Sequence, residues 1–144
     1  MAITFCHSFC FSPTGGTAKI AEAIAEGTGL SHKLTDVTLR KHREIATVFS
    51  PEALVLLAVP VYFGRVERHA AEAISSIQGQ GQPAILVVNY GNRHYDDALL
   101  ELHSLAVNAG FVPIAAGAFV SEHSFSTPES PMAAGRPDQR DLEQ

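Results

Sequence analysis

The sequence predicts an α/β protein built on a doubly wound, five-stranded parallel sheet, with helices covering both faces in three layers. Apolar runs of strand length alternate along the chain with segments whose apolar residues recur at helical spacing, which is the pattern of repeated βαβ units. Several of these runs carry too few charges to leave either face in water, as expected for buried parallel strands. Right-handed crossovers then leave few arrangements, and we expect the strand order 2-1-3-4-5.

The first half of the chain contains two expected strands and one expected helix. Residues 2–8 form an apolar strand, and residues 18–25 form a helix that ends at a glycine-rich turn. Residues 32–39 alternate more weakly and are more polar, which is typical of a strand at a sheet edge. Residues 40–52 begin with a short basic run, expected to be a solvated turn. Their pattern leaves two alternatives open, a short helix or a turn into the next strand.

The second half of the chain repeats the strand and helix alternation. A continuous apolar run predicts a strand over residues 53–59, and a helix follows over residues 66–77. The same pattern predicts a strand over residues 83–89 and an amphipathic helix over residues 96–109. A fifth strand over residues 111–120 completes the expected sheet.

The chain end resembles the start of a last helix. Residues 121–144 are rich in Pro, Ser and Gly until Pro137 and Asp138, which together indicate a helix N-terminus. The remaining residues supply at most about two turns. We therefore expect a single domain over residues 1–144 whose last helix is incomplete at the C-terminus.

Composition narrows the classes of partner. The 144 residues, of which 46% are hydrophobic, suffice for the core of one domain. The formal net charge of -5 disfavours nucleic acid as a partner. No apolar run approaches the roughly 20 residues that would span a bilayer, so no membrane insertion is expected. Two cysteines, Cys6 and Cys10, are too few for a disulfide framework or a zinc site. With no signal peptide at the N-terminus, a cytoplasmic location is expected.

A loop rich in hydroxyl groups and glycine follows the first expected strand. Residues 12–17 read SPTGGT and precede the first helix. Glycines allow a sharp turn with inward-pointing amides, and the helix N-terminus adds further amides and a positive dipole end. The spacing does not match the triphosphate or dinucleotide motifs. The pattern predicts a phosphate-monoester site formed by Ser12, Thr14, Gly15, Gly16 and Thr17.

Aromatic residues and glycines follow the third and fourth expected strands. A flat ring system such as isoalloxazine requires aromatic faces for stacking and backbone groups for its polar edge. The alternative interpretation is that these aromatic residues only cover the edge of the sheet. The first of these loops contains Pro60, Val61, Tyr62, Phe63, Gly64 and Arg65, and the second contains Asn89, Tyr90, Gly91, Asn92, Arg93, Tyr95 and Asp96.

With these three motifs, the chain resembles flavodoxins over nearly its whole length. A narrower resemblance is to the branch in which a flavodoxin-like domain precedes a ferredoxin-type domain with 4Fe-4S clusters. Beyond the two aromatic loops, this narrower resemblance rests on Glu122, His123 and Ser124 together with residues 135–138. No cysteine motif for such a cluster occurs in this chain.

The resemblance implies a function in electron transfer. It implies non-covalent FMN and one-electron exchange with an iron-sulfur partner, either fused or separate. Gly64 matches the glycine whose peptide group in flavodoxins can turn toward the flavin N5. An alternative in a different class is an FMN-dependent NAD(P)H or quinone reductase on the same fold.

Two departures from typical flavodoxins concern charge and aromatic stacking. Arg65 and Arg93 flank the expected ring site, where positive charge would stabilise an anionic reduced flavin. Partner contact or plain surface exposure are the alternative roles for both arginines. The chain contains no tryptophan, which leaves Tyr62, Tyr90 or Tyr95 to stack on the ring.

Overall fold

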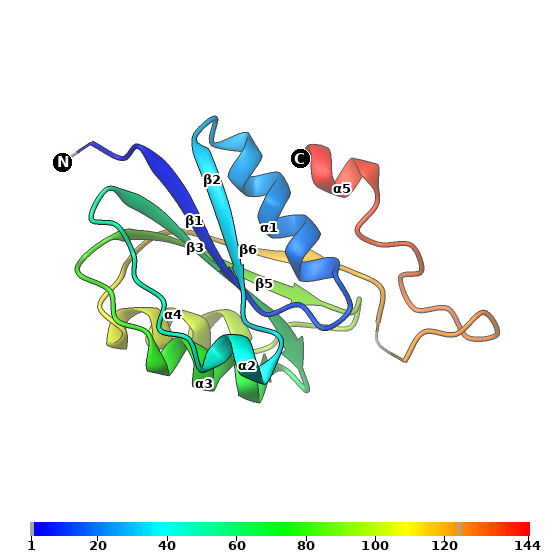
Figure 1. Cartoon of the computed structure of the whole chain (residues 1–144). Coiled ribbons are helices and arrows are strands. Elements are labelled where there is room, and N and C mark those ends of the chain that lie inside the picture. The colour runs from blue at the N-terminus through cyan, green and yellow to red at the C-terminus, as the bar shows by residue number, and fades with distance from the viewer. Residues whose placement is uncertain (1, 124) are drawn as a thin grey trace.

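The computed structural model describes residues 2–123 and 125–144 and contains one central parallel sheet (Figure 1). The strand order is β2-β1-β3-β5-β6, with a short β4 paired antiparallel to β3. This order confirms the expected 2-1-3-4-5 arrangement, in which the fourth and fifth expected strands are β5 and β6. The strands are β1 (Phe5–Cys10), β2 (Ser31–Asp36), β3 (Ala53–Tyr62), β4 (Arg65–Val66), β5 (Pro83–Tyr90) and β6 (Val112–Val120).

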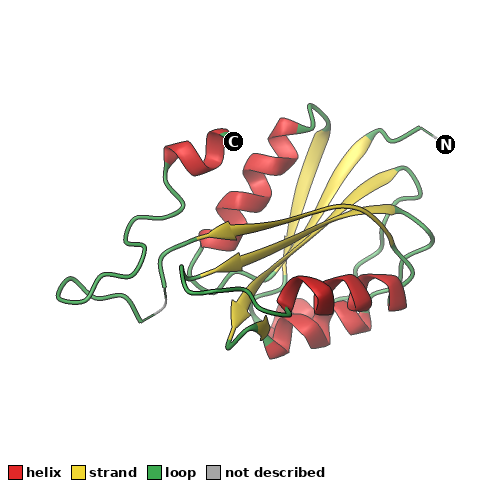
Figure 2. Cartoon of the chain, turned by 180° about the vertical axis from the view of Figure 1, so that it is seen from behind, coloured by secondary structure: helices red, strands yellow, loops and turns green. Residues whose placement is uncertain are grey.

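Helices cover the sheet from both sides (Figures 1 and 2). On one side lies α1 (Gly16–Gly27), next to which α5 (Gln139–Glu143) packs. On the other side lie α2 (Arg40–Arg43), α3 (Arg68–Ser76) and α4 (Ala98–Asn108). Within residues 2–123 and 125–144, no helix has the length and apolarity that a membrane crossing requires.

The alternating side chains of the central strands fill two separate cores. Successive residues of a strand point to opposite faces, so β3 and β5 contribute to both. One core lies under α1 and includes Cys6, Ile20, Leu56, Ala58 and Val87. The larger core lies under α3 and α4 and includes Phe9, Val55, Leu57, Ile74, Leu86 and Leu102.

The segment that joins β3 to α3 differs from the expected loop. β3 continues to Tyr62, because Val61 pairs with Val66 and Tyr62 pairs with Arg65 in β4. Helix α3 therefore begins at Arg68 and not at residue 66. Its start is fixed by Glu67, whose carboxylate Oε2 accepts a hydrogen bond of 2.9 Å from the Ala70 amide.

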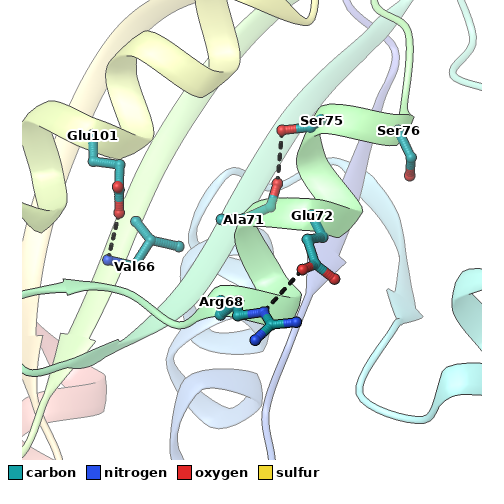
Figure 3. Close-up of a pocket in the computed structure, with 7 residues that line it drawn as sticks. All are labelled: Val66, Arg68, Ala71, Glu72, Ser75, Ser76 and Glu101. Carbon is teal, nitrogen blue, oxygen red and sulfur yellow. Dashed lines mark hydrogen bonds and ion pairs between the residues drawn. The ribbon is translucent and has the colours of Figure 1, made fainter.

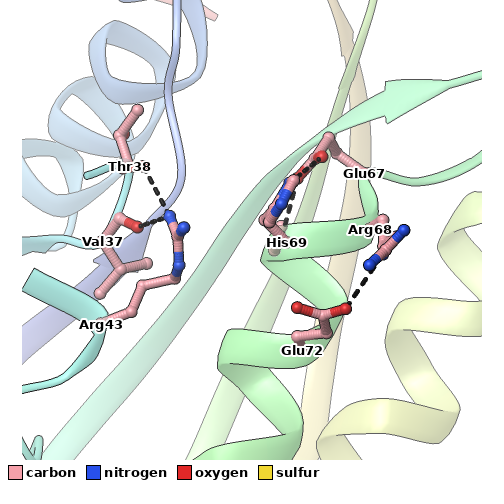
Figure 4. Close-up of polar contacts among 8 residues, drawn as sticks. Val37, Thr38, Arg43, Glu67, Arg68, His69 and Glu72 are labelled. Atoms are coloured by element: carbon pink, nitrogen blue, oxygen red, sulfur yellow. Dashed lines mark hydrogen bonds and ion pairs between the residues drawn. The ribbon is translucent and has the colours of Figure 1, made fainter. Parts of the chain in front are cut away.

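Residues 40–52 combine both alternatives that the sequence left open. One helical turn, α2, is followed by an extended segment that buries Phe49 in the larger core. Arg43 is not simply solvated, because its guanidinium Nη1 donates to the carbonyl oxygens of Val37 at 3.0 Å and Thr38 at 2.6 Å (Figure 4). The end of the basic run thus anchors α2 to the chain that leaves β2.

Candidate functional site

The three predicted loops meet at one edge of the sheet, where β1, β3 and β5 have their carboxyl ends. Close approaches at glycine positions show which loops touch. A Cβ on Gly16 would lie 3.0 Å from the Cβ of Ser121 and 3.3 Å from the side-chain amide group of Asn89. A Cβ on Gly64 would lie 2.5 Å from Asp96 Oδ2. The hydroxyl-rich loop therefore lies against the end of β5, and the β3–β4 turn lies against the loop that follows β5.

The hydroxyl-rich loop forms the N-terminus of α1. Gly15 is the N-cap residue and has a φ of +87°, a backbone conformation that residues with an L side chain rarely adopt. Ser12 supplies the missing cap, since its Oγ accepts a hydrogen bond of 3.0 Å from the Ala18 amide. This bond uses an oxygen lone pair, and the hydroxyl proton of Ser12 remains available for an anion. The Ser12 amide donates a hydrogen bond of 2.8 Å to Thr38 Oγ1.

The sequence predicts that the hydroxyl groups of this loop point toward one phosphate. In the structure they do not all point to the same place. Thr14 is exposed, whereas Thr17 is 2% exposed and lies beneath the loop. The Thr17 Oγ1 lies 3.0 Å from the side-chain amide group of Asn89. Thr17 therefore connects the first turn of α1 to the sheet, and Ser12 is the residue whose hydroxyl caps the same turn from the loop.

The β3–β4 connection is a two-residue hairpin turn at Phe63 and Gly64. Their φ angles are +53° and +74°, which a type I′ turn requires at both central positions. Phe63 is 92% exposed, while the Gly64 backbone is buried. A bulky side chain in this conformation is an outlier. The turn thus presents an aromatic ring to solvent at the expense of backbone strain.

Glu101 of α4 holds this hairpin from the side. Its Oε1 accepts a hydrogen bond of 2.7 Å from the Val66 amide (Figure 3), and its Oε2 pairs with the Arg65 guanidinium. The hydrogen bond and charge of Glu101 raise the pKa of Arg65 above its ordinary value. The sequence could not reveal this role of Glu101, because a pair separated by 36 residues leaves no local signal.

Aromatic rings cluster at the end of β5 and in the loop that follows it. The Tyr90 and Tyr95 ring centroids lie 5.5 Å apart, and His94 stacks on Tyr95 at 5.1 Å. Tyr95 packs against the larger core, so one face of its ring is already used. Arg93 is exposed, and among the described residues none forms an ion pair with it. Tyr62, at 39% exposure, and Tyr90 are the tyrosines that extend from the strand ends.

The chain after β6 closes the remaining side of this edge. The Ser121 amide donates to the Tyr90 carbonyl oxygen at 2.9 Å, and a Cβ on Gly91 would lie 2.6 Å from His123 Cδ2. Farther along, Arg136 pairs with Asp141 and lowers the pKa of that carboxyl to about 2. Ser124, named in the narrower resemblance, lies outside the described residues.

Two surface grooves lie elsewhere. One, of about 530 Å³, runs between α3 and α4 (Figure 3), and the other, of about 420 Å³, runs between α2 and α3. Glu72 lines both grooves and pairs on the surface at 3.1 Å with Arg68, which lines the first. Neither groove contains a residue of the three predicted loops, so the candidate site rests on the sheet edge and not on these grooves.

The start of α1 suits a phosphate group. The first turn of a helix has amides without intrahelical partners and a positive dipole end. A side chain at Gly15 would meet no atom within 4 Å, so the space above the loop is open. The free proton of Ser12 adds a donor at the same turn. These features accommodate a phosphate without a metal ion or an obligatory lysine.

Comparison with known proteins shows the fold. No family model and no curated protein matches the sequence. A flavodoxin from Streptococcus pneumoniae TIGR4 matches with a TM-score of 0.58 at 16% identity, covering 97% of this chain and 91% of its own. A flavodoxin from the domain Archaea matches with a TM-score of 0.56 at 13% identity, covering 97% and 89%. The Trp repressor binding protein from Bacillus subtilis matches with a TM-score of 0.50 at 11% identity, covering 97% and 94%.

These matches establish a flavodoxin-like α/β fold for the chain, in agreement with the expected sheet order. The broader of the two resemblances is thereby confirmed at the level of the fold. The comparisons contain no indication of a ferredoxin-type domain with 4Fe-4S clusters.

Proposed function

We propose that this chain binds FMN non-covalently at the carboxyl edge of its sheet and transfers electrons. The observation that carries the proposal is the contact of the α1 N-terminal loop with β5, and of the β3–β4 hairpin with the loop after β5. A phosphate site is thereby joined to two aromatic loops along one edge. In doubly wound sheets this edge is the usual place for a ligand.

Each part of FMN has candidate partners in the chain. The phosphate would be held by the first turn of α1 and its loop, through Ser12, Thr14, Gly15 and Gly16, with Thr17 beneath them as the support of the turn. The ring would be bordered by the two later loops, through Pro60 to Arg65 and through Tyr90 to Arg93, with Tyr95 and Asp96 behind them, while Asn89 lies buried beneath the phosphate loop. Bound FMN supplies the electron chemistry, whereas the protein orients the ring and adjusts its potential.

Tyr62 and Phe63 support a role in contact with a second redox protein. Both side chains are exposed at the tip of the hairpin, at 39% and 92%. Aromatic residues of this kind are enriched at protein interfaces. We infer a separate or fused iron-sulfur protein as the electron-transfer partner, because one-electron exchange is the chemistry such a partner performs.

Titration of the apoprotein with FMN tests the central proposal. Flavin fluorescence should be quenched with saturation, and Gly15→Asp should weaken binding by about a hundredfold through repulsion of the phosphate. Gly29→Asp is the matched control, because Gly29 has a φ of +71° and its added side chain also meets no atom within 4 Å. It should leave FMN affinity unchanged. Absence of FMN binding, or equal effects of the two substitutions, would contradict the proposal.

Mixing experiments with the FMN-loaded protein distinguish electron transfer from the reductase alternative. A reduced ferredoxin should bleach the flavin absorbance rapidly, whereas NADPH should leave it unchanged over the same time. Rapid bleaching by NADPH would replace the electron-transfer proposal with an NAD(P)H-dependent reductase.

A further inference from the structure

Three polar side chains from separate elements are buried together beneath the hydroxyl-rich loop. Thr17 of α1, Asn89 of β5 and Ser121 after β6 are 2%, 5% and 7% exposed. Buried polar groups lower stability unless they are hydrogen-bonded. The Asn89 side chain lies between the other two and can satisfy both.

The amide orientation of Asn89 that satisfies its surroundings uses both ends of the group. With Oδ1 toward α1, it accepts from Thr17 Oγ1 at 3.0 Å and from the Thr17 amide at 3.2 Å. The Nδ2 then donates to the Phe119 carbonyl oxygen at 3.1 Å, and Ser121 Oγ lies 2.9 Å from Oδ1. Amide orientation follows from the hydrogen-bond network, and this orientation pairs donors with acceptors throughout.

These bonds attach the first turn of α1 to the sheet. The Thr17 amide belongs to that turn, so the Asn89 carbonyl fixes its height above β5. Gly16 lies directly against Ser121, where a Cβ would come within 3.0 Å. The positions of the Gly15 and Gly16 amides are therefore set by contacts from the sheet side of the loop.

Asn89 is a polar residue on a face of β5 where the preceding residue, Val87, is apolar. Val87 lies two residues earlier, is buried in the core under α1, and needs no polar partner. An apolar residue at position 89 would satisfy burial equally well. A buried amide that engages Thr17 in two ways contributes specificity of geometry and not only packing.

We propose that Asn89 is a positioning residue for the phosphate end of the site, which sets the amides of the α1 first turn where they meet a phosphate. The inference rests on the proposed FMN function. Asn89 acts through Thr17 and Ser121 and need not touch the ligand. A displacement of the turn by about 1 Å would lengthen several amide-to-phosphate hydrogen bonds at once.

Comparison of FMN with riboflavin isolates this role, because riboflavin lacks the phosphate. Asn89→Ala should weaken FMN binding about tenfold and change riboflavin binding by less than about twofold. A purely structural role would weaken both ligands by the same factor, since it would only reduce the fraction of binding-competent protein. The measured quantity is therefore the ratio of the two dissociation constants.

Gln82→Ala provides the matched control. Gln82 also has a buried amide side chain, 2% exposed, but it directly precedes β5, at the end of the strand opposite to Asn89. Its amide donates to the Phe49 and Ser50 carbonyl oxygens. Its substitution should lower stability and leave the FMN to riboflavin ratio unchanged. An equal change of that ratio in both variants would overturn the positioning role while FMN binding stands.

Ser121→Ala keeps the test decisive if Asn89→Ala does not fold. It removes one partner of Asn89 and leaves the asparagine in place, so a smaller loss for FMN than in Asn89→Ala is expected, with riboflavin unaffected. Equal loss of FMN and riboflavin affinity would overturn the proposal. If the unmodified protein bound neither flavin, both this inference and the proposed function would fail together.

Discussion

Gly64 is the position where a single methyl group should reveal whether the hairpin and the loop after β5 touch. Gly64→Ala places an L side chain at a φ of +74°, which costs about 1–2 kcal/mol. The new Cβ would also lie 2.5 Å from Asp96 Oδ2 and 2.9 Å from Asp96 Cβ. Such overpacking adds about 1–3 kcal/mol, so the combined loss of unfolding free energy should be about 2–5 kcal/mol.

Two further variants separate these contributions. Gly29→Ala has nearly the same φ, +71°, with no atom within 4 Å of the added Cβ. It should show the backbone cost alone, about 1–2 kcal/mol. Asp96→Gly removes the opposing atoms, and glycine suits the φ of +43° at that position. Combined with Gly64→Ala, it should recover most of the steric part.

Urea unfolding of the apoprotein, followed by far-UV circular dichroism, measures the parent, the three single variants and the double variant on one scale. The double-mutant cycle gives the coupling between positions 64 and 96, expected at about 1–2 kcal/mol. Equal losses for Gly64→Ala and Gly29→Ala, or additive effects in the cycle, would show that the two loops do not touch. The argument for a joined site would then fail.

Two other predictions concern pH and charge. Burial of His7, which is 1% exposed, lowers its pKa to about 4. The protonated form is thus favoured only on unfolding, so stability should be full above about pH 6.5 and fall by about 3 kcal/mol down to pH 4. Urea unfolding should show a shallower pH dependence for His7→Phe, and an unchanged one would refute this assignment. Arg93→Gln should make the flavin reduction potential more negative, because it removes a positive charge that would stabilise the anionic reduced flavin by about 0.5–1 kcal/mol. Potentiometric titration should show less effect for Arg65→Gln, because Arg65 is already paired with a carboxylate; the reverse order would contradict this.

The sheet order could be predicted from the sequence because hydrophobic patterning and crossover handedness are strong, cooperative constraints. The hairpin at Phe63 and Gly64 could not. Its second strand, β4, has only two residues, and its turn lacks the Asn-Gly or Asp-Gly pair that usually marks a type I′ turn. The start of α3 was consequently expected two residues too early, at residue 66.

The residues of the candidate site also fall into two groups, those that the sequence predicts and those that it does not. The loop glycines and Asn89 could be selected from the sequence because they lie at, or a few residues after, the ends of strands. Glu101, Thr38 and Ser121 were not selected, since each acts on a residue at least 26 positions away. Local sequence patterns do not indicate contacts between residues that are so far apart in the chain. The exposed Thr14 and the buried Thr17 differ for the same reason, because burial depends on β5 and on the chain after β6.

Phe63 shows that stability and surface chemistry compete at the tip of the hairpin. Asparagine or glycine adopts a φ of +53° more readily than phenylalanine, so either residue should stabilise the fold by about 1 kcal/mol. The chain instead places an apolar ring there, almost completely in water. If stability of the fold alone determined the residue at this position, phenylalanine would not be favoured. The side chain at position 63 therefore represents a trade of thermodynamic stability for an exposed aromatic surface.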